Sequence, residues 1–196
     1  MKLRSGRTYI IKSNFNNNKF IILDIDHTLI HSKRIDPTIK FGEFGDFNIC
    51  DNEYTIYKRP YVDKFIEWCF NNFNGILVWS AGTKIYVDNV VKYLFKSPLK
   101  PIMILTRKNC SINYSNNRYY KDFSTLDATL KNLGISPNTS KMFFVDDLPH
   151  RIKNLNSQYI IPIKPYWTRR HIWRDRSFSG DRDNHLLKIM KMSYNI

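Results

Sequence analysis

Two carboxylates near the start of the chain, Asp24 and Asp26, are the residues best placed to do chemistry. They stand two positions apart and directly follow an apolar run, residues 20–23, that is typical of a buried strand. Both side chains can reach one site where the chain turns at the end of that strand. One carboxylate can attack an electrophile and bind a cation, while the other moves protons. The pair therefore suits phosphoryl transfer through an aspartyl-phosphate.

The elements that must position this pair follow from apolar runs and helical spacings along the chain. Further strands are predicted at 76–79, 102–105, 142–145 and 160–163. Helices are predicted to begin near Pro60, Thr83, Ser124 and Asp183. Residues 31–58 predict loops with a small β-hairpin, and residues 107–120 predict turns. The alternation of strand and helix predicts an α/β fold: one Rossmann-like domain whose central parallel sheet has helices on both faces. It also predicts a small β insert and no large cap domain.

Composition indicates one folded domain within the 196 residues, with a polar N-terminal arm at 1–18 and the domain at 19–196. The apolar share of 42% supports a real core. No apolar run approaches the roughly 20 residues of a membrane span, and no apolar stretch follows the charged N-terminus, so we expect no membrane association and no secretory signal. Three scattered cysteines without a CxxC pair indicate reduced thiols in an intracellular protein, of the nucleus or the cytoplasm.

Polar side chains follow three of the predicted strands at the point where each strand ends. Asp24 and Asp26 follow the first, Ser80 follows the second, and Asp146 and Asp147 follow the fourth. In open α/β sheets, ligands bind beyond the carboxyl ends of the strands. We therefore expect these side chains to gather in one crevice.

These motifs together resemble the haloacid dehalogenase superfamily. More narrowly, the chain is similar to the phosphatases that act on the C-terminal domain of RNA polymerase II and to their small relatives. The segments that carry the resemblance are 24–28, 58–65, 79–82, 120–124, 145–147 and 179–187. The resemblance covers residues 19–190 and implies a haloacid dehalogenase-type domain with phosphatase activity.

Chemistry and resemblance agree on the roles of five residues. Asp24 is the expected nucleophile, and Asp26 is the expected general acid and base. Thr28 is expected to hold their geometry by hydrogen bonding. Ser80 is expected to donate to a phosphoryl oxygen, and Lys121 to offset the negative charge there.

A magnesium site is expected beside the nucleophile. Asp146 and Asp147 would join Asp24 in an oxygen-rich set of the kind that Mg²⁺ prefers, and in the family the backbone carbonyl of Asp26 also contacts the metal. The family usually has asparagine at the second place of the late pair, so Asp147 adds a negative charge. By resemblance in position, Arg107 is a further candidate for contact with substrate.

The formal net charge of +14 favours anionic partners. The expected activity is hydrolysis of phosphoserine or phosphothreonine in a protein or peptide. Two alternatives stay open: a nucleic-acid 3′-phosphatase, and a catalytically weak scaffold that binds phosphopeptides. The densest basic and aromatic stretch, at 167–176, fits either an anion-binding surface or a basic surface loop.

Overall fold

The computed structural model describes residues 18–35, 45–51, 53–136, 140–168 and 183–192. The predicted arm at 1–18 lies almost entirely outside these residues, as does all of the basic and aromatic stretch except its first two positions. Across the described residues, no helix has the length and apolar character needed to cross a membrane.

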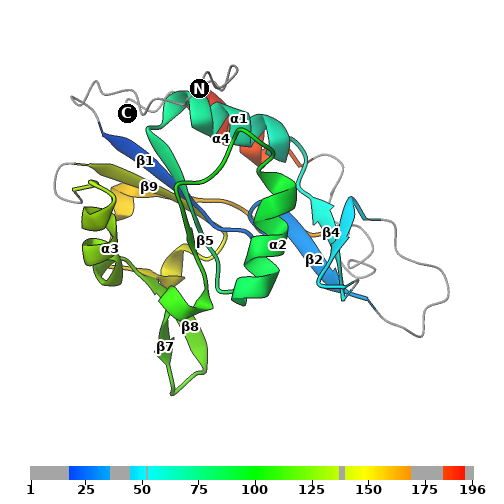
Figure 1. The fold of residues 1–196 in the computed structure, drawn as a ribbon, viewed down its shortest axis with the longest axis horizontal. Helices are drawn as coiled ribbons and strands as arrows, with labels where there is room; N and C mark the ends of the chain where they lie inside the picture. The colour runs from blue at the N-terminus through cyan, green and yellow to red at the C-terminus, as the bar shows by residue number, and fades with distance from the viewer. Residues whose placement is uncertain (1–17, 36–44, 52, 137–139, 169–182, 193–196) are drawn as a thin grey trace, which may run out of the picture.

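A five-stranded parallel sheet forms the centre of the fold (Figure 1). Its strands, in spatial order, are β11 (Ile160–Pro162), β9 (Lys141–Asp146), β1 (Lys19–Leu23), β5 (Gly75–Trp79) and β6 (Met103–Leu105). The four apolar runs that sequence predicted beyond the first thus all become strands of one sheet. Because β1 lies between β9 and β5, the three strand ends that carry polar residues are neighbours.

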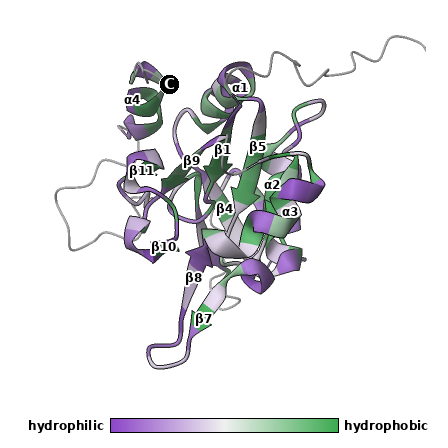
Figure 2. Cartoon of the chain, turned by 90° about the vertical axis from the view of Figure 1, so that its left-hand side faces the viewer, coloured by the Kyte–Doolittle hydropathy of each residue, from purple (hydrophilic) through white to green (hydrophobic). Residues whose placement is uncertain are grey.

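Helices cover both faces of this sheet, as the sequence predicted. One face packs against α1 (Val62–Asn72), α2 (Lys84–Leu94) and α4 (His185–Lys191). The other face packs against a short 3₁₀ helix, η2 (Phe123–Leu126), and α3 (Asp127–Asn132). Alternate residues of β1 divide between the two cores, with Ile21 and Leu23 on the first face and Phe20 and Ile22 on the second. Figure 2 shows the apolar strands enclosed between helices with polar outer surfaces.

Local side chains explain where the helices begin and end. The Thr83 hydroxyl accepts a hydrogen bond from the Tyr86 amide, which confirms the predicted start of α2. The next helical segment begins close to Ser124, as predicted, but its capping residue is Asp122 rather than Ser124. The Asp122 carboxylate accepts from both the amide and the hydroxyl of Ser124, at 3.1 and 2.7 Å, and so caps η2. Gly134 ends α3 in a left-handed conformation, with φ of +72°, that glycine adopts without strain.

The segment that connects β1 to α1 in the sequence forms a small antiparallel sheet. It consists of β2 (Ile30–Arg34), β4 (Tyr54–Lys58) and β3 (Phe47–Ile49), paired in that order. This confirms the predicted β insert, with one strand more than a hairpin. No large cap domain lies between β1 and α1 among the residues that the structure describes.

A second antiparallel pair was missed, because residues 107–120 were predicted as turns. Strands β7 (Ser111–Asn113) and β8 (Arg118–Asp122) form a hairpin that projects from the body of the domain (Figures 1 and 2). Strand β10 (Ile152–Lys153) pairs with β8 in parallel. The remaining elements of the described residues are three 3₁₀ turns: η1 (Arg107–Asn109), η3 (Pro149–Arg151) and η4 (Ser157–Tyr159).

Candidate active site

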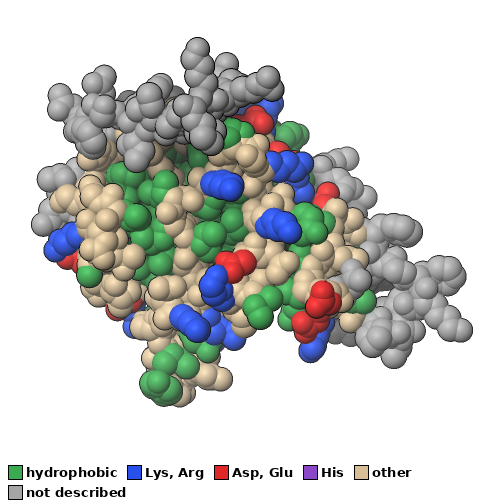
Figure 3. All heavy atoms as spheres, in the orientation of Figure 1, with side chains coloured by type: hydrophobic (Ala, Val, Ile, Leu, Met, Phe, Trp, Pro, Cys, Tyr) green, Lys and Arg blue, Asp and Glu red, His purple; other side chains and the backbone are tan. Residues whose placement is uncertain are grey.

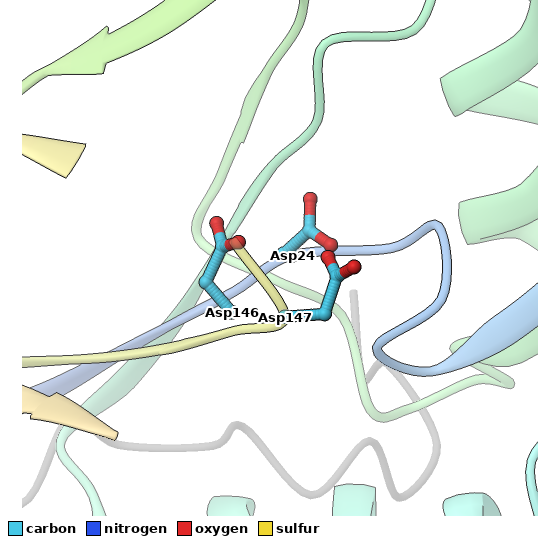
Figure 4. Close-up of side chains that lie close together, drawn as sticks. All are labelled: Asp24, Asp146 and Asp147. Atoms are coloured by element: carbon cyan, nitrogen blue, oxygen red, sulfur yellow. The ribbon is translucent and has the colours of Figure 1, made fainter. Parts of the chain in front are cut away.

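Three carboxylates meet at the carboxyl ends of β1 and β9. Oxygen atoms of Asp24, Asp146 and Asp147 all lie within 4.8 Å of one another. Asp24 and Asp146 are buried, and Asp147 is half-buried. Figure 4 shows the three side chains side by side, with Asp24 following β1 and the other two at the end of β9. The backbone fixes this meeting, because the Asp24 amide donates to the Val145 carbonyl at 3.0 Å.

The Lys121 ammonium lies between two of these carboxylates. It comes from β8, the strand that sequence reasoning missed, and it is only 6% exposed. Its Nζ donates to Asp24 and, at 2.7 Å, to Oδ2 of Asp146. A buried ammonium without partners is costly, so the two carboxylates hold it in place. The structure therefore brings together the predicted nucleophile and the predicted lysine, which are 97 residues apart.

The Asp26 carboxylate faces a different set of groups. It accepts hydrogen bonds from the hydroxyls of Tyr86, Ser32 and Ser80, the last two at 3.3 and 3.4 Å. Its side chain is therefore not part of the three-carboxylate cluster. The expected contact between its backbone carbonyl and a metal remains a prediction. The Ser80 hydroxyl oxygen accepts a hydrogen bond from the Gly82 amide at 2.9 Å, which fixes the position of this side chain.

Thr28 links the early acidic pair to the late one. Its hydroxyl accepts a hydrogen bond from the Asp147 amide at 3.1 Å, although the two residues are 119 positions apart. This contact supports the late pair, so the expected role of Thr28 in holding the geometry of Asp24 and Asp26 stays a prediction. The neighbouring Asp146 carboxylate accepts from the Leu148 amide at 2.7 Å, which fixes the turn after β9.

A buried arginine anchors the loop that carries Asp26. Arg59 is 1% exposed and donates to the carbonyls of His27 and Thr28, at 3.3 and 3.0 Å. It also forms a two-pronged ion pair with Asp183, at 2.9 and 2.8 Å. His27 has a φ of +61°, a conformation that non-glycine residues rarely adopt. The contacts from Arg59 help to hold this strained backbone in place.

The three-carboxylate cluster lies in the wall of a cavity of about 340 Å³, whereas Thr28, Arg59 and Ser80 lie behind that wall. Asp24, Asp26, Lys121, Asp146, Asp147 and the predicted Arg107 all contribute to its walls. Arg107 is held by a 2.8 Å hydrogen bond from its Nε to the Ala81 carbonyl, and its guanidinium lies 5.1 Å from the Tyr119 ring. On the face shown in Figure 3, acidic side chains lie close to Lys and Arg side chains above the β7–β8 hairpin.

Burial and charge shift the pKa values of these groups. Burial raises the pKa of Asp24 to about 8. The Lys121 charge lowers this pKa, and the Asp146 charge raises it further. Burial and the Asp146 charge raise the pKa of Asp147 to about 6. Burial alone would lower the pKa of Lys121, but the carboxylates of Asp24 and Asp146 raise it above its ordinary value. The site thus holds more negative charge than one lysine compensates.

This charge imbalance fits a hard divalent cation. Three carboxylates supply only oxygen ligands, which are the ligands that Mg²⁺ and Ca²⁺ take in proteins. A dication beside them would lower the raised pKa values and keep the carboxylates ionised near neutral pH. The donor set therefore has the chemistry that a magnesium site requires.

Several site residues were not identified from the sequence. Tyr86, which donates to Asp26, shares a helix face with Val90 four residues on, and this apolar spacing was the available signal. Ser32, Tyr119 and Arg151 also line the cavity, and their sequence context carried no such signal.

Comparison with protein families gives a match over nearly all of the described domain. The family model of NLI interacting factor-like phosphatases matches residues 19–195. This range includes every candidate site residue named above.

Individual relatives are more distant. Protein 355R of Invertebrate iridescent virus 3, whose name describes it as CTD phosphatase-like, is 25% identical over 90% of this chain and 95% of its own length. CTD nuclear envelope phosphatase 1B of Danio rerio is 28% identical over 93% of this chain and 69% of its own length. The solved structure of Fcp1, an RNA polymerase II CTD phosphatase, has a TM-score of 0.50 and 18% identity over 75% of this chain and 42% of that protein. The structural match supports the fold.

Proposed function

This chain belongs to the NLI interacting factor-like phosphatase family, and from that premise we propose that it hydrolyses phosphoserine or phosphothreonine in protein substrates. The observation that carries the proposal is the placement of Lys121 between Asp24 and Asp146, beside the carboxylate of Asp147. A nucleophile, a cation for the phosphoryl oxygens and an acidic ligand set in one cavity are the parts that phosphoryl transfer to a carboxylate needs.

The proposed reaction has two steps. In the first, an Asp24 carboxylate oxygen attacks phosphorus in line, the bond from phosphorus to the serine or threonine oxygen breaks, and Asp26 protonates that leaving oxygen. In the second, Asp26 takes a proton from water, whose oxygen attacks the phosphorus of the aspartyl-phosphate. The bond from phosphorus to the Asp24 oxygen then breaks, which regenerates the Asp24 carboxylate and releases inorganic phosphate. Hydrogen bonds from Tyr86 and Ser32 would orient Asp26 for both transfers.

We further propose that Asp24, Asp146 and Asp147 hold Mg²⁺, with the backbone carbonyl of Asp26 as a further ligand. The ion would supply Lewis-acid stabilisation of the phosphoryl charge and allow an anionic nucleophile to approach an anionic substrate. Ser80 and Lys121 would bind phosphoryl oxygens, and Arg107 would contact the substrate nearby. The Thr28 hydroxyl would keep Asp147 in place through its amide.

Two features support a protein substrate. Relatives named as CTD phosphatases and a nuclear envelope phosphatase share the fold or family of this chain. In addition, the described part of the insert between β1 and α1 is a three-stranded sheet rather than a large cap domain, which supports a large substrate.

The test is a side-by-side assay of an aryl phosphate, phosphoserine peptides and 3′-phosphorylated oligonucleotides, with and without Mg²⁺. The proposal predicts Mg²⁺-dependent hydrolysis of the peptides, lost in Asp24→Asn and kept in Asp127→Asn, a change to an exposed residue of α3. Faster hydrolysis of the oligonucleotides would instead support a nucleic-acid phosphatase. Tight binding of phosphopeptides without turnover by folded protein would support a scaffold.

A further inference from the structure

Arg151 is a cavity-lining cation that the proposed reaction does not use. It is the last residue of η3, the turn that follows the two aspartates at the end of β9. Its Nε is buried and has no hydrogen-bond partner among the described residues. The Arg151 guanidinium also forms no ion pair with any described residue. An arginine nitrogen shielded from water and left unpaired is costly, so a structure that keeps one calls for an explanation, and binding of an anion by the guanidinium is one that fits its place in the cavity wall.

The neighbouring strands place Arg151 close to the reacting groups. Strand β10 begins directly after Arg151 and pairs in parallel with β8, with Ile152 opposite Lys121. Arg151 is therefore one residue from the position that faces the site lysine. Lys121 itself is occupied by two carboxylates, whereas Arg151, on this side of the cavity, forms no ion pair with any residue that the structure describes.

Arg107 and Arg151 approach the cavity from different sides. Arg107 follows β6, whereas Arg151 follows β9, and β5 and β1 lie between those two strands. Three strand spacings separate β6 from β9, which is about 14 Å. Asp24 follows β1, between them, so the phosphoryl group that it attacks would lie between the two arginines. The distance suits contacts to different groups of one substrate.

We propose that Arg151 binds a second anionic group of the substrate, placed to one side of the phosphate that is removed. Resting on the proposed function, this inference specifies its substrate class: phosphopeptides with an acidic or phosphorylated residue near the reacting phosphoresidue. An extended peptide advances about 3.3 Å per residue, so the second group would stand one to three residues away. Guanidinium groups suit this task because their planar fork binds carboxylates and phosphates through two hydrogen bonds.

The experiment measures kcat/KM for a panel of phosphoserine peptides. Each peptide carries one aspartate, at one of the three positions on either side of the phosphoserine, and a peptide without an added charge is the reference. A hydrogen bond between charged groups predicts about a tenfold preference for an aspartate on one flank only. A peptide with a second phosphoserine at the same position tests the other source of the charge, and NaCl should weaken both preferences.

The variants assign the preference to one side chain. Arg151→Gln should reduce the ratio of kcat/KM for the acidic peptide to kcat/KM for the reference peptide to near one. Arg151→Lys should keep part of this preference, because lysine retains the charge without the planar fork. Arg118→Gln is the matched control, since Arg118 is an exposed arginine on β8 that does not line the cavity. It should leave the ratio unchanged. Thermal unfolding of each variant checks that the comparison is between folded proteins.

Three kinds of result would overturn the inference. The first concerns the preference itself: either the acidic preference survives Arg151→Gln, or an active wild type shows none. The second is an equal loss of kcat/KM in Arg151→Gln for an aryl phosphate, which has no second anionic group. That result would place Arg151 on the reacting phosphate itself. The third is dependence on Arg151 for oligonucleotides but not for peptides. Absence of any hydrolysis of phosphopeptides would instead refute the proposed function.

Discussion

The buried ion pair between Arg59 and Asp183 offers a sharp test of how the candidate site is held together. Arg59 forms five hydrogen bonds, two of them to Asp183 and the others to the carbonyls of His27, Thr28 and Lys164. Replacement by methionine keeps most of the apolar stem and removes every one of these bonds. It also leaves a largely buried carboxylate without its partner. Removal of one member of a buried pair costs about 3–5 kcal/mol, a large fraction of the 5–15 kcal/mol typical of a whole domain.

Urea unfolding of wild type and Arg59→Met at pH 7 measures this loss. The control is Asp127→Asn, which breaks an exposed pair with Lys131 and should cost less than about 1 kcal/mol. Because Arg59 also holds the loop beside Asp26, the folded fraction of Arg59→Met should have a reduced kcat. A loss of stability below about 1 kcal/mol would refute the inference that this pair anchors the loop.

The pH dependence of the free energy of unfolding provides an independent check that the Arg59–Asp183 pair stabilises the fold. Burial would raise the pKa of Asp183, but the hydrogen bonds and charge of Arg59 lower it below its ordinary value. The pair therefore stabilises the fold fully above the pKa of an unfolded aspartate, near 4, and this stabilisation is lost as the pH falls through the lower folded value. In Arg59→Met, burial still raises that pKa and only the contacts with His185 oppose it, so the loss of stability relative to wild type should shrink below about pH 4. A deficit independent of pH would contradict this explanation.

Three further predictions concern the cavity. Thr28→Val removes the acceptor of the Asp147 amide and should weaken Mg²⁺ binding about tenfold, as measured by calorimetric titration; unchanged affinity would contradict the positioning role. Tyr86→Phe removes a donor to Asp26 and should lower kcat on an aryl phosphate about tenfold, whereas an unchanged kcat would show that Asp26 needs no such support. Mg²⁺ at a hundred times its dissociation constant should stabilise the wild type by about 2.7 kcal/mol in urea unfolding, and no stabilisation would argue against a metal site.

The central sheet could be predicted from sequence because its strands are fully buried. Runs such as 20–23 and 76–79 are continuously apolar, since helices cover both faces of the strands. Strand β8 could not be found in this way. Its residues are polar or aromatic, and the strand is stabilised by pairing with β7 and β10 rather than by apolar packing on both faces.

The site was partly predictable for a related reason. Asp24 and Asp146 could be proposed because each directly follows an apolar run in the sequence, and the fold brings the ends of such strands together. Lys121 was proposed by resemblance, while its strand was missed. The hydrogen bond from Tyr86 to Asp26 joins residues 60 positions apart, and a single sequence carries no direct signal for such a contact. The Arg151 Nε, which has no hydrogen-bond partner in the described part of the chain, depends in the same way on packing that only the folded structure shows.

The most direct test of the central claim is to identify the residue that carries phosphate during turnover. The protein would be mixed with excess phosphopeptide and Mg²⁺, quenched in acid within one turnover, digested, and analysed by mass spectrometry. Our account predicts one phosphoryl group on the peptide that contains Asp24 and none in the Asp24→Asn variant. Phosphate on another residue, or full turnover by the variant, would contradict the assignment of Asp24 as the nucleophile.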